Sequence, residues 1–163
     1  MRHILRRREW LPDEWRYFGE AFAEGDAVVV PLAELRSEPQ RWGGWSGPLG
    51  VRLSVVDRAE DLAAELARLA LVAVEFPSPG EGRGYSQGRL LRERLGFRGE
   101  LRAVGAGVRQ DLVYLLARCG FDALELAAGE DVAAAQRAFA RYDVAYQPGA
   151  PEVRLRRQRY FAR

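Results

Sequence analysis

One glycine- and proline-rich stretch decides the fold, and it runs Phe76-Pro77-Ser78-Pro79-Gly80-Glu81-Gly82-Arg83-Gly84-Tyr85-Ser86. It follows an apolar run over 71–76 that is typical of a buried strand, and it precedes a helical pattern of leucines at Leu90, Leu91 and Leu95. A strand, a glycine-rich loop and a helix start form the anion or cofactor site of many α/β proteins. The stretch therefore predicts the fold class and the place of a site.

The same alternation continues on both sides of this stretch. Further strands are predicted over 49–55, 101–104 and 123–126. The helical patterns cover 62–69, 86–95, 108–119 and 132–142, with Asp57 as a cap before the first and Gly96 and Gly120 as stops after the second and third. Short links between such units imply parallel βαβ connections. We expect an α/β fold with a mostly parallel sheet of about four βα units, open or half-barrel-like.

The N-terminal third is less regular. Residues 9–48 carry an aromatic cluster and several breakers, with one short strand predicted over 27–31 at an edge of the sheet. We therefore expect an irregular, aromatic-rich N-terminal segment. The length of 163 residues fits a single domain, 1–163.

Charge is concentrated at the two ends. The chain carries a net charge of +2, yet four arginines fall within residues 1–8 and five within 153–163, so the body between them is acidic. We expect these basic ends to be mobile and solvated, or else to dock an acidic partner. Nucleic acid is disfavoured as a partner, because the acidic body would repel a phosphate backbone.

Composition excludes several kinds of chemistry. All 25 basic side chains are arginine, the one histidine is His3, and the one cysteine is Cys119. A Schiff-base lysine, a Walker-type phosphate loop and a Ser-His-Asp or Cys-His hydrolase are therefore disfavoured, and no metal site is predicted. The sequence shows neither a membrane span nor a secretory signal, and we expect a cytoplasmic protein.

The candidate ligand-binding residues lie on the two loops that follow the strands 71–76 and 101–104. They are Arg83, Gly84, Tyr85, Ser86, Arg109 and Asp111. A guanidinium and a serine hydroxyl at a helix start suit sulfate, sulfite, phosphate or a carboxylate. The alternative is structural: Ser86 caps the helix, Tyr85 packs, and Arg83 pairs with Glu81 or Glu75. Both remain open, and so does the choice between ligand contact and solvated charges for Arg109 and Asp111.

Other motifs carry weaker signals. The glycines of the loop do not have the G-x-G-x-x-G spacing of a dinucleotide site, and no acid ends the next strand, so no cofactor is identified. Glu100 and Arg102 are two apart on one strand face, which predicts a structural ion pair. Cys119 lies on the apolar face of its helix, which predicts a buried thiol.

Five segments together resemble a known bacterial family, domain of unknown function 934. They are Phe76-Pro77-Ser78, Gly82-Arg83-Gly84-Tyr85-Ser86, Leu91-Arg92-Glu93-Arg94-Leu95-Gly96, Gly99-Glu100-Leu101-Arg102-Ala103-Val104-Gly105 and Arg118-Cys119-Gly120-Phe121-Asp122. Two N-terminal segments, Asp13-Glu14-Trp15 and Val30-Pro31-Leu32, are also similar to the family, so the resemblance covers most of the chain.

The resemblance implies an oxidoreductase role in assimilatory sulfite reduction. It favours an accessory or reductase component that binds a small oxyanion or an anionic cofactor at the loop 77–86. The alternative is a non-catalytic partner that docks on sulfite reductase or another sulfur-assimilation protein. The chain departs from the family pattern at Ala106, where an acid is common, at the order Gln110-Asp111, and at Pro79 and Glu81. If the missing acid is catalytic in relatives, this chain has lost that activity, so whether it is an enzyme stays open.

Overall fold

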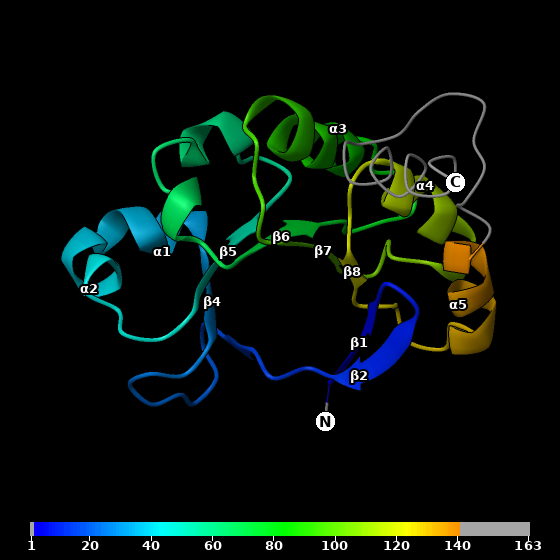
Figure 1. Cartoon of the computed structure of the whole chain (residues 1–163), viewed down its shortest axis with the longest axis horizontal. Coiled ribbons are helices and arrows are strands. Elements are labelled where there is room, and N and C mark those ends of the chain that lie inside the picture. The colour runs from blue at the N-terminus through cyan, green and yellow to red at the C-terminus, as the bar shows by residue number, and fades with distance from the viewer. Residues whose placement is uncertain (1, 141–163) are drawn as a thin grey trace, which may run out of the picture.

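The computed structural model describes residues 2–140. In this part of the chain eight strands form one sheet, which is curved into a half-barrel (Figure 1). The sheet order is β2-β1-β8-β7-β6-β5-β4-β3. The strands are β1 (His3–Arg6), β2 (Glu9–Pro12), β3 (Arg16–Tyr17), β4 (Val28–Pro31), β5 (Leu49–Leu53), β6 (Leu71–Glu75), β7 (Glu100–Val104) and β8 (Ala123–Leu124). The predicted α/β class is confirmed, and of the two predicted sheet shapes, open or half-barrel-like, the structure has the half-barrel.

Six strands, β3 to β8, are parallel and follow one another in chain order, whereas β1 and β2 are antiparallel. The prediction of about four βα units was therefore too small, and the N-terminal segment is not irregular. Residues 9–48 supply three strands and β1 precedes them, each of two to four residues. Strands this short show no readable alternation of apolar and polar residues, which is why the sequence pattern missed three of them. The strand predicted at 27–31 is present as β4, but β3 lies outside it at the sheet edge.

The basic N-terminal end is part of the sheet. Ile4 and Leu5 are buried in β1, so the prediction that residues 1–8 form a mobile end was wrong for the described residues 2–8. The physical reason is that the two apolar residues between the arginines gain more by burial than the charges lose, because the arginines stay at the surface. The other predicted basic end, 153–163, lies outside the described residues.

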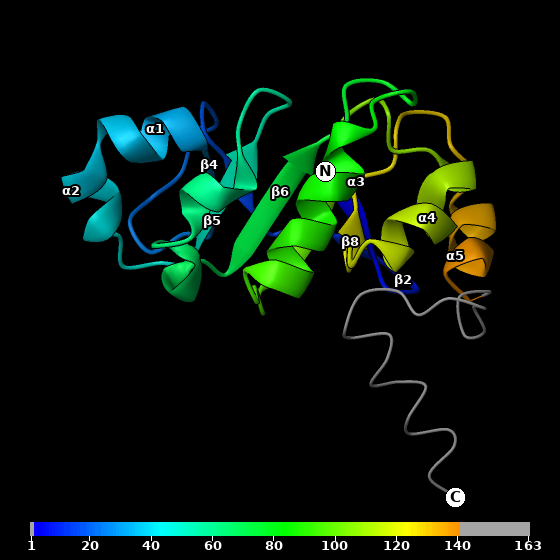
Figure 2. The same cartoon turned by 90° about the horizontal axis from the view of Figure 1, so that it is seen from above.

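Helices cover the outer, convex side of the sheet (Figures 1 and 2). The α-helices are α1 (Leu32–Ser37), α2 (Pro39–Gly43), α3 (Arg83–Arg89), α4 (Val113–Arg118) and α5 (Val132–Ala140). The short 3-10 helices are η1 (Ala59–Leu62), η2 (Leu66–Arg68) and η4 (Gln110–Leu112), and η3 (Leu90–Arg94) is a π-helical continuation of α3. Right-handed crossovers between neighbouring parallel strands place all helices on one face, and the main apolar core lies beneath them.

Helix boundaries differ from expectation in two places. The predicted helix over 62–69 is only the two turns η1 and η2, and Asp57 instead accepts hydrogen bonds from Ser54 N–H and Oγ, both at 2.7 Å. The helix predicted over 86–95 begins earlier, at Arg83. The stops at Gly96 and Gly120 are confirmed, with φ of 68° and 97°. The last helix ends its described part at Ala140, and the predicted Tyr142 lies outside it.

The connection between β2 and β3 fixes the curvature of the sheet. These strands are the two edges of the sheet, yet only residues 13–15 join them. A flat sheet of this many strands would be about 34 Å wide, whereas the four Cα steps from Pro12 to Arg16 span at most about 14 Å. The sheet must therefore curl until its edges nearly meet. Within residues 2–140 no helix is long and apolar enough to cross a bilayer.

Two loops at the carboxyl ends of the parallel strands are packed tightly. Gly107 N–H donates to the Phe76 carbonyl at 2.7 Å, and a Cβ at Gly84 would lie 2.5 Å from the buried Phe76 ring. Gly82, two residues earlier, has open space at its Cβ position. The glycines of the predicted loop thus have different roles, of which one is close packing.

We predict that Gly84→Ala lowers the free energy of unfolding by about 1–3 kcal/mol, because the added methyl group overlaps a ring that is locked in the core. The matched control Gly82→Ala should change it by less than about 0.5 kcal/mol. Urea denaturation of the two variants measures both values. Equal effects would contradict this account of the packing.

Candidate functional site

The predicted site residues lie at the rim formed by the carboxyl ends of the parallel strands. Arg83 to Ser86 follow β6 and begin α3, and Arg109 and Asp111 follow β7. In sheets of this kind the rim is where ligands bind, because the loops there are free to vary on a rigid support. The placement of the six candidates at one rim agrees with the sequence analysis; their contact with a ligand remains a prediction.

Gly84 and Tyr85 serve packing. Gly84 is buried against the Phe76 ring, as described above, and the Tyr85 ring stacks edge-on against the same ring with centroids 5.1 Å apart. Burial raises the pKa of Tyr85, with smaller contributions from the charges of Cys119 and Asp111. Tyr85 therefore packs as the structural alternative describes, while its contact with a ligand remains a prediction; the hydrogen bond from Gly107 N–H to the Phe76 carbonyl holds the loops after β6 and β7 together.

Arg83 and Ser86 are exposed and three residues apart, so they are neighbours on one side of α3. Arg83 Nη2 lies 3.4 Å from the Asp57 carbonyl, a long contact, and its backbone N–H donates to Glu81 Oε1 at 3.0 Å. Neither Glu81 nor Glu75 forms an ion pair with the Arg83 guanidinium; Glu75 pairs with Arg52 at 2.7 Å. The predicted Arg83 ion pair and the predicted Ser86 cap are therefore both wrong.

Ser86 does not cap the helix because the helix starts earlier than the sequence predicts. Gly82 is the N-cap and makes no side-chain cap, so Ser86 lies one turn inside the helix. The Glu81 carboxylate already contacts the first helical N–H. An anion at this loop would therefore be held by the Arg83 and Ser86 side chains more than by the helix N-terminus.

Arg109 contacts both Asp111 and Glu130. Arg109 Nε is 3.5 Å from Asp111 Oδ1 and 3.7 Å from Glu130 Oε1, and half of its side chain is exposed. Gln110, between them, is structural: its N–H donates to Glu130 Oε2 at 2.7 Å, and its side-chain oxygen accepts from Asp131 N–H. This geometry resembles solvated surface pairs, which contribute little to stability.

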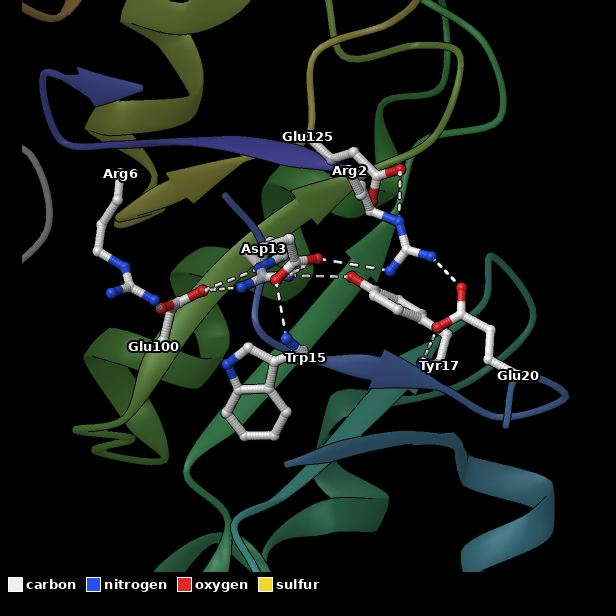
Figure 3. A network of polar contacts seen from close by, with 9 residues as sticks. Arg2, Arg6, Asp13, Trp15, Tyr17, Glu20, Glu100 and Glu125 are labelled. Carbon is white, nitrogen blue, oxygen red and sulfur yellow. Dashed lines mark hydrogen bonds and ion pairs between the residues drawn. The ribbon is translucent and has the colours of Figure 1, made fainter. Parts of the chain in front are cut away.

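The sequence analysis missed a second cluster, inside the curve of the sheet. Arg102, on β7, is fully buried, and its Nη1 donates to both carboxylate oxygens of Asp13 at 2.9 Å. Nη1 also lies 3.2 Å from the Tyr17 hydroxyl, and Nε donates to Glu100 Oε1 at 2.8 Å. The predicted Glu100–Arg102 ion pair is confirmed, but it is one side of a larger network (Figure 3).

In this network the effect of burial on each group's pKa is opposed by the charges of its neighbours. Burial alone would lower the pKa of Arg102, but Tyr17, Glu100 and Asp13 raise it, so the guanidinium stays charged. Burial raises the pKa of Tyr17 and Arg102 partly offsets this, so the phenol stays neutral. Arg102 Nη2 lies 2.7 Å from Glu100 Oε1, yet the geometry is poor for a hydrogen bond, and the contact is best described as an ion pair.

Arg2 closes the mouth of the same cluster. Its guanidinium lies 4.2 Å from the centre of the Tyr17 ring, bonds Glu20, and lies 3.4 Å from Asp13 and 3.9 Å from Glu125 (Figure 3). Glu20 in turn accepts the Tyr17 N–H at 2.8 Å, which satisfies an outward-facing donor of the edge strand β3. Arg2 thus connects the two edges of the curled sheet.

Part of the signal for this cluster was present in the sequence. Asp13 and Arg102 both fall in segments that resemble the family, and Glu100 and Arg102 share a strand face. What the sequence could not give was their contact, because Asp13 and Arg102 are 89 residues apart.

Another family segment is explained by a structural clamp. Arg92 donates to the carbonyls of Phe97, Gly99 and Gly120 at 2.8–3.0 Å and pairs with Asp122. Asp122 also accepts the Leu101 N–H at 2.9 Å. Arg92 and Asp122 therefore hold the end of η3 to the starts of β7 and β8. Cys119 is buried as predicted, and burial raises its pKa, so it is a poor nucleophile.

Within the described part of the chain, His, Cys, Asp and Glu side chains form no group of three or more that could hold a metal ion.

We predict that Glu20 stabilises the fold at neutral pH and that this contribution is lost in acid. The hydrogen bond from Tyr17 N–H and the contact with Arg2 lower its pKa from the ordinary 4.5. A carboxyl group whose pKa is lower in the folded than in the unfolded protein stabilises the fold at pH values above its unfolded-state pKa. This stabilisation is lost as the pH falls through the folded-state pKa. The difference in free energy of unfolding between the wild type and Glu20→Gln should therefore be present at pH 7 and shrink below about pH 4.5.

Urea denaturation between pH 7 and pH 3 measures this difference. The control is Glu24→Gln, at an exposed position of the same segment, which should lie close to the wild type throughout. A Glu20→Gln difference that stays constant down to pH 3 would contradict the assignment.

The chain was compared with known proteins and with models of protein families. No curated protein matches the chain. A family model described as "Bacterial protein of unknown function (DUF934)" matches residues 50–155, more than half of the chain and including the rim loops, the Arg92 clamp and Arg102. The chain therefore belongs to this bacterial family of unknown function, DUF934.

Proposed function

We propose that the protein is an accessory component of assimilatory sulfite reduction that binds a small oxyanion at Arg83 and Ser86. The resemblance noted in the sequence motivates the pathway, and the rim geometry motivates the ligand. The observation that carries the proposal is the state of Arg83: it is an exposed guanidinium at the rim, and within residues 2–140 it has no carboxylate partner.

The neighbours of Arg83 support an oxyanion of small size. Gly84 and Tyr85 fix the helix start by packing, so the direction of the Arg83 side chain is set by a rigid base. The exposed Ser86 hydroxyl on the same side adds a donor. A planar fork and a hydroxyl match the oxygens of sulfite, sulfate or phosphate, which accept several hydrogen bonds at once.

The alternative is a non-catalytic partner that docks through its basic ends. At the N-terminus, Arg2 and Arg6 are engaged within the protein: Arg2 as described, and Arg6 with Glu100 at 2.6 Å. Docking by charge would therefore depend on the exposed Arg7 and Arg8 and on residues 153–163, the latter outside the described residues. The Arg83 site is the better supported of the two.

Arg83→Ala should weaken oxyanion binding by roughly one to two decades, because a charge-assisted hydrogen bond contributes about 1.5–3 kcal/mol. The melting temperature without ligand should change little, because Arg83 is exposed. Thermal shift with sulfite, sulfate and phosphate, against chloride of equal ionic strength, measures both quantities.

The control is Arg36→Ala, another exposed arginine, which pairs with Asp61. Sulfate and phosphate stabilise many proteins by exclusion from the surface, and that effect should be equal in the wild type and both variants. Only the part of the anion-dependent thermal shift that is lost in Arg83→Ala and kept in Arg36→Ala reports binding at this site. If no such part exists, the oxyanion proposal is wrong.

The pathway is tested separately by growth. A strain of the parent bacterium without this gene should fail on sulfate and on sulfite and should grow on sulfide, because only sulfide lies after the reduction. Restoring the wild-type gene should restore growth on all three sources. Unimpaired growth on sulfite would place the protein outside this pathway.

A further inference from the structure

Glu81 places a negative charge at the edge of the rim site that contains Arg83. Its Oε1 accepts the backbone N–H of Arg83 at 3.0 Å, and its own N–H donates to the Ser78 carbonyl at 3.2 Å. The first bond holds the side chain, and the second closes a turn of the backbone. The carboxylate is therefore held against the first residue of α3.

The loop around this carboxylate is open to solvent. Gly80 and Gly82, on either side of Glu81, are exposed, and a Cβ at either position would meet no other atom within 4 Å. Arg83 is exposed as well. An ion can therefore reach the Arg83 side chain from solvent, and on the way it meets the charge of Glu81.

An oxyanion held by both Arg83 and Ser86 would lie over the first turn of α3. The Cα–Cβ bonds of a helix tilt toward its N-terminus, so the Ser86 hydroxyl covers the turn that begins at Arg83. The Glu81 carboxylate is bound to the Arg83 N–H in that same turn. Since one turn rises about 5.4 Å, the ion and the carboxylate would be about 6 Å apart.

The other charged groups beside Arg83 add no positive charge. Arg58 and Glu60 lie 3.6 Å apart and offset each other. The Asp57 carbonyl is the contact of the Arg83 guanidinium, and the Asp57 carboxylate accepts two bonds from the loop that precedes it. Around the contact the single charge of Arg83 therefore faces the two carboxylates of Glu81 and Asp57.

This arrangement affects a doubly charged ligand more than a singly charged one. Each ligand charge is attracted by the guanidinium and repelled by the carboxylates, so a second charge on the ligand adds no net attraction. The cost of removing an ion from water, in contrast, grows with the square of its charge. A site of this kind therefore suits an oxyanion with one negative charge.

We propose that Glu81 limits the charge of the ligand, so that the Arg83 site takes singly charged oxyanions in preference to doubly charged ones. Hydrogensulfite and dihydrogenphosphate belong to the favoured class, whereas sulfate does not. The inference rests on the oxyanion site proposed above, and it adds the class of substrate and the residue that selects it.

The test compares methanesulfonate with sulfate, which are similar in shape but carry one and two negative charges. Binding is measured by calorimetry at a constant ionic strength of about 0.1 M. The wild type should bind methanesulfonate at least as tightly as sulfate. Glu81→Gln removes the charge but keeps an oxygen that can accept the Arg83 N–H. It should tighten methanesulfonate about twofold and sulfate about fourfold, because doubling the ligand charge squares the factor.

The control is Glu93→Gln, which makes the same change of charge on the same helical segment. Glu93 pairs with Arg89 at 3.2 Å and lies about 15 Å along the helix from Arg83, beyond the screening length of about 10 Å. This variant should bind both probes as the wild type does. Adding Arg83→Ala to Glu81→Gln should abolish the gain for both probes.

The outcomes separate this inference from the function on which it rests. Sulfate bound more tightly than methanesulfonate by the wild type, equal gains for the two probes in Glu81→Gln, or a gain that survives Arg83→Ala overturns the charge limit. If the wild type binds in an Arg83-dependent way and Glu81→Gln changes nothing, the charge limit is wrong and the oxyanion site stands. If neither the wild type nor Glu81→Gln binds either probe, the oxyanion site is wrong and the charge limit fails with it.

Discussion

The contact between Arg102 and Asp13 holds the two ends of the sheet together. Eight strands must curl because three residues connect the outermost two, and curling brings the middle of β7 opposite the start of the connection. A guanidinium buried at that point needs a counter-ion with good geometry. Asp13 provides it with two oxygens, and Glu100 provides a second partner. Arg2 repeats the arrangement at the mouth, where it meets Glu20 and Glu125. The curved sheet is thus closed by side chains, since β2 and β3 do not pair with each other.

The elements that could be predicted were those whose own residues and immediate neighbours carry the full sequence pattern of a strand or a helix end. The strands β5 and β6 are largely apolar runs between breakers, β7 alternates charged and apolar residues between glycines, and the stops at Gly96 and Gly120 follow from glycine's tolerance of positive φ. The strands β1 and β3 could not be predicted, because they are short and carry arginines; in β1 the charge of Arg6 is neutralised by Glu100, which is far away in the sequence. The cap assigned to Ser86 failed for a similar reason: the helix starts at a glycine, which gives no polar cap signal.

The segments that resemble the family divide into two groups in this structure. Arg92, Asp122, Gly84 and Arg102 have full structural explanations in close contacts. Arg83 and Ser86 are exposed and have few contacts. A family motif therefore does not by itself identify a site, because most of its residues here serve packing or ion pairing. The exposed residues at the rim, Arg83 and Ser86, are the ones that motivate a ligand.

The central claim is that Arg102 and Asp13 act on each other directly, and a double-mutant cycle tests it. The variants are Arg102→Met, Asp13→Asn and the two combined, and the quantity is the free energy of unfolding from urea denaturation at pH 7. We predict a coupling energy of about 1 kcal/mol or more, because each single change leaves the other group buried without its partner. Single effects that simply add, with a coupling near zero, would contradict the account of how this sheet is closed.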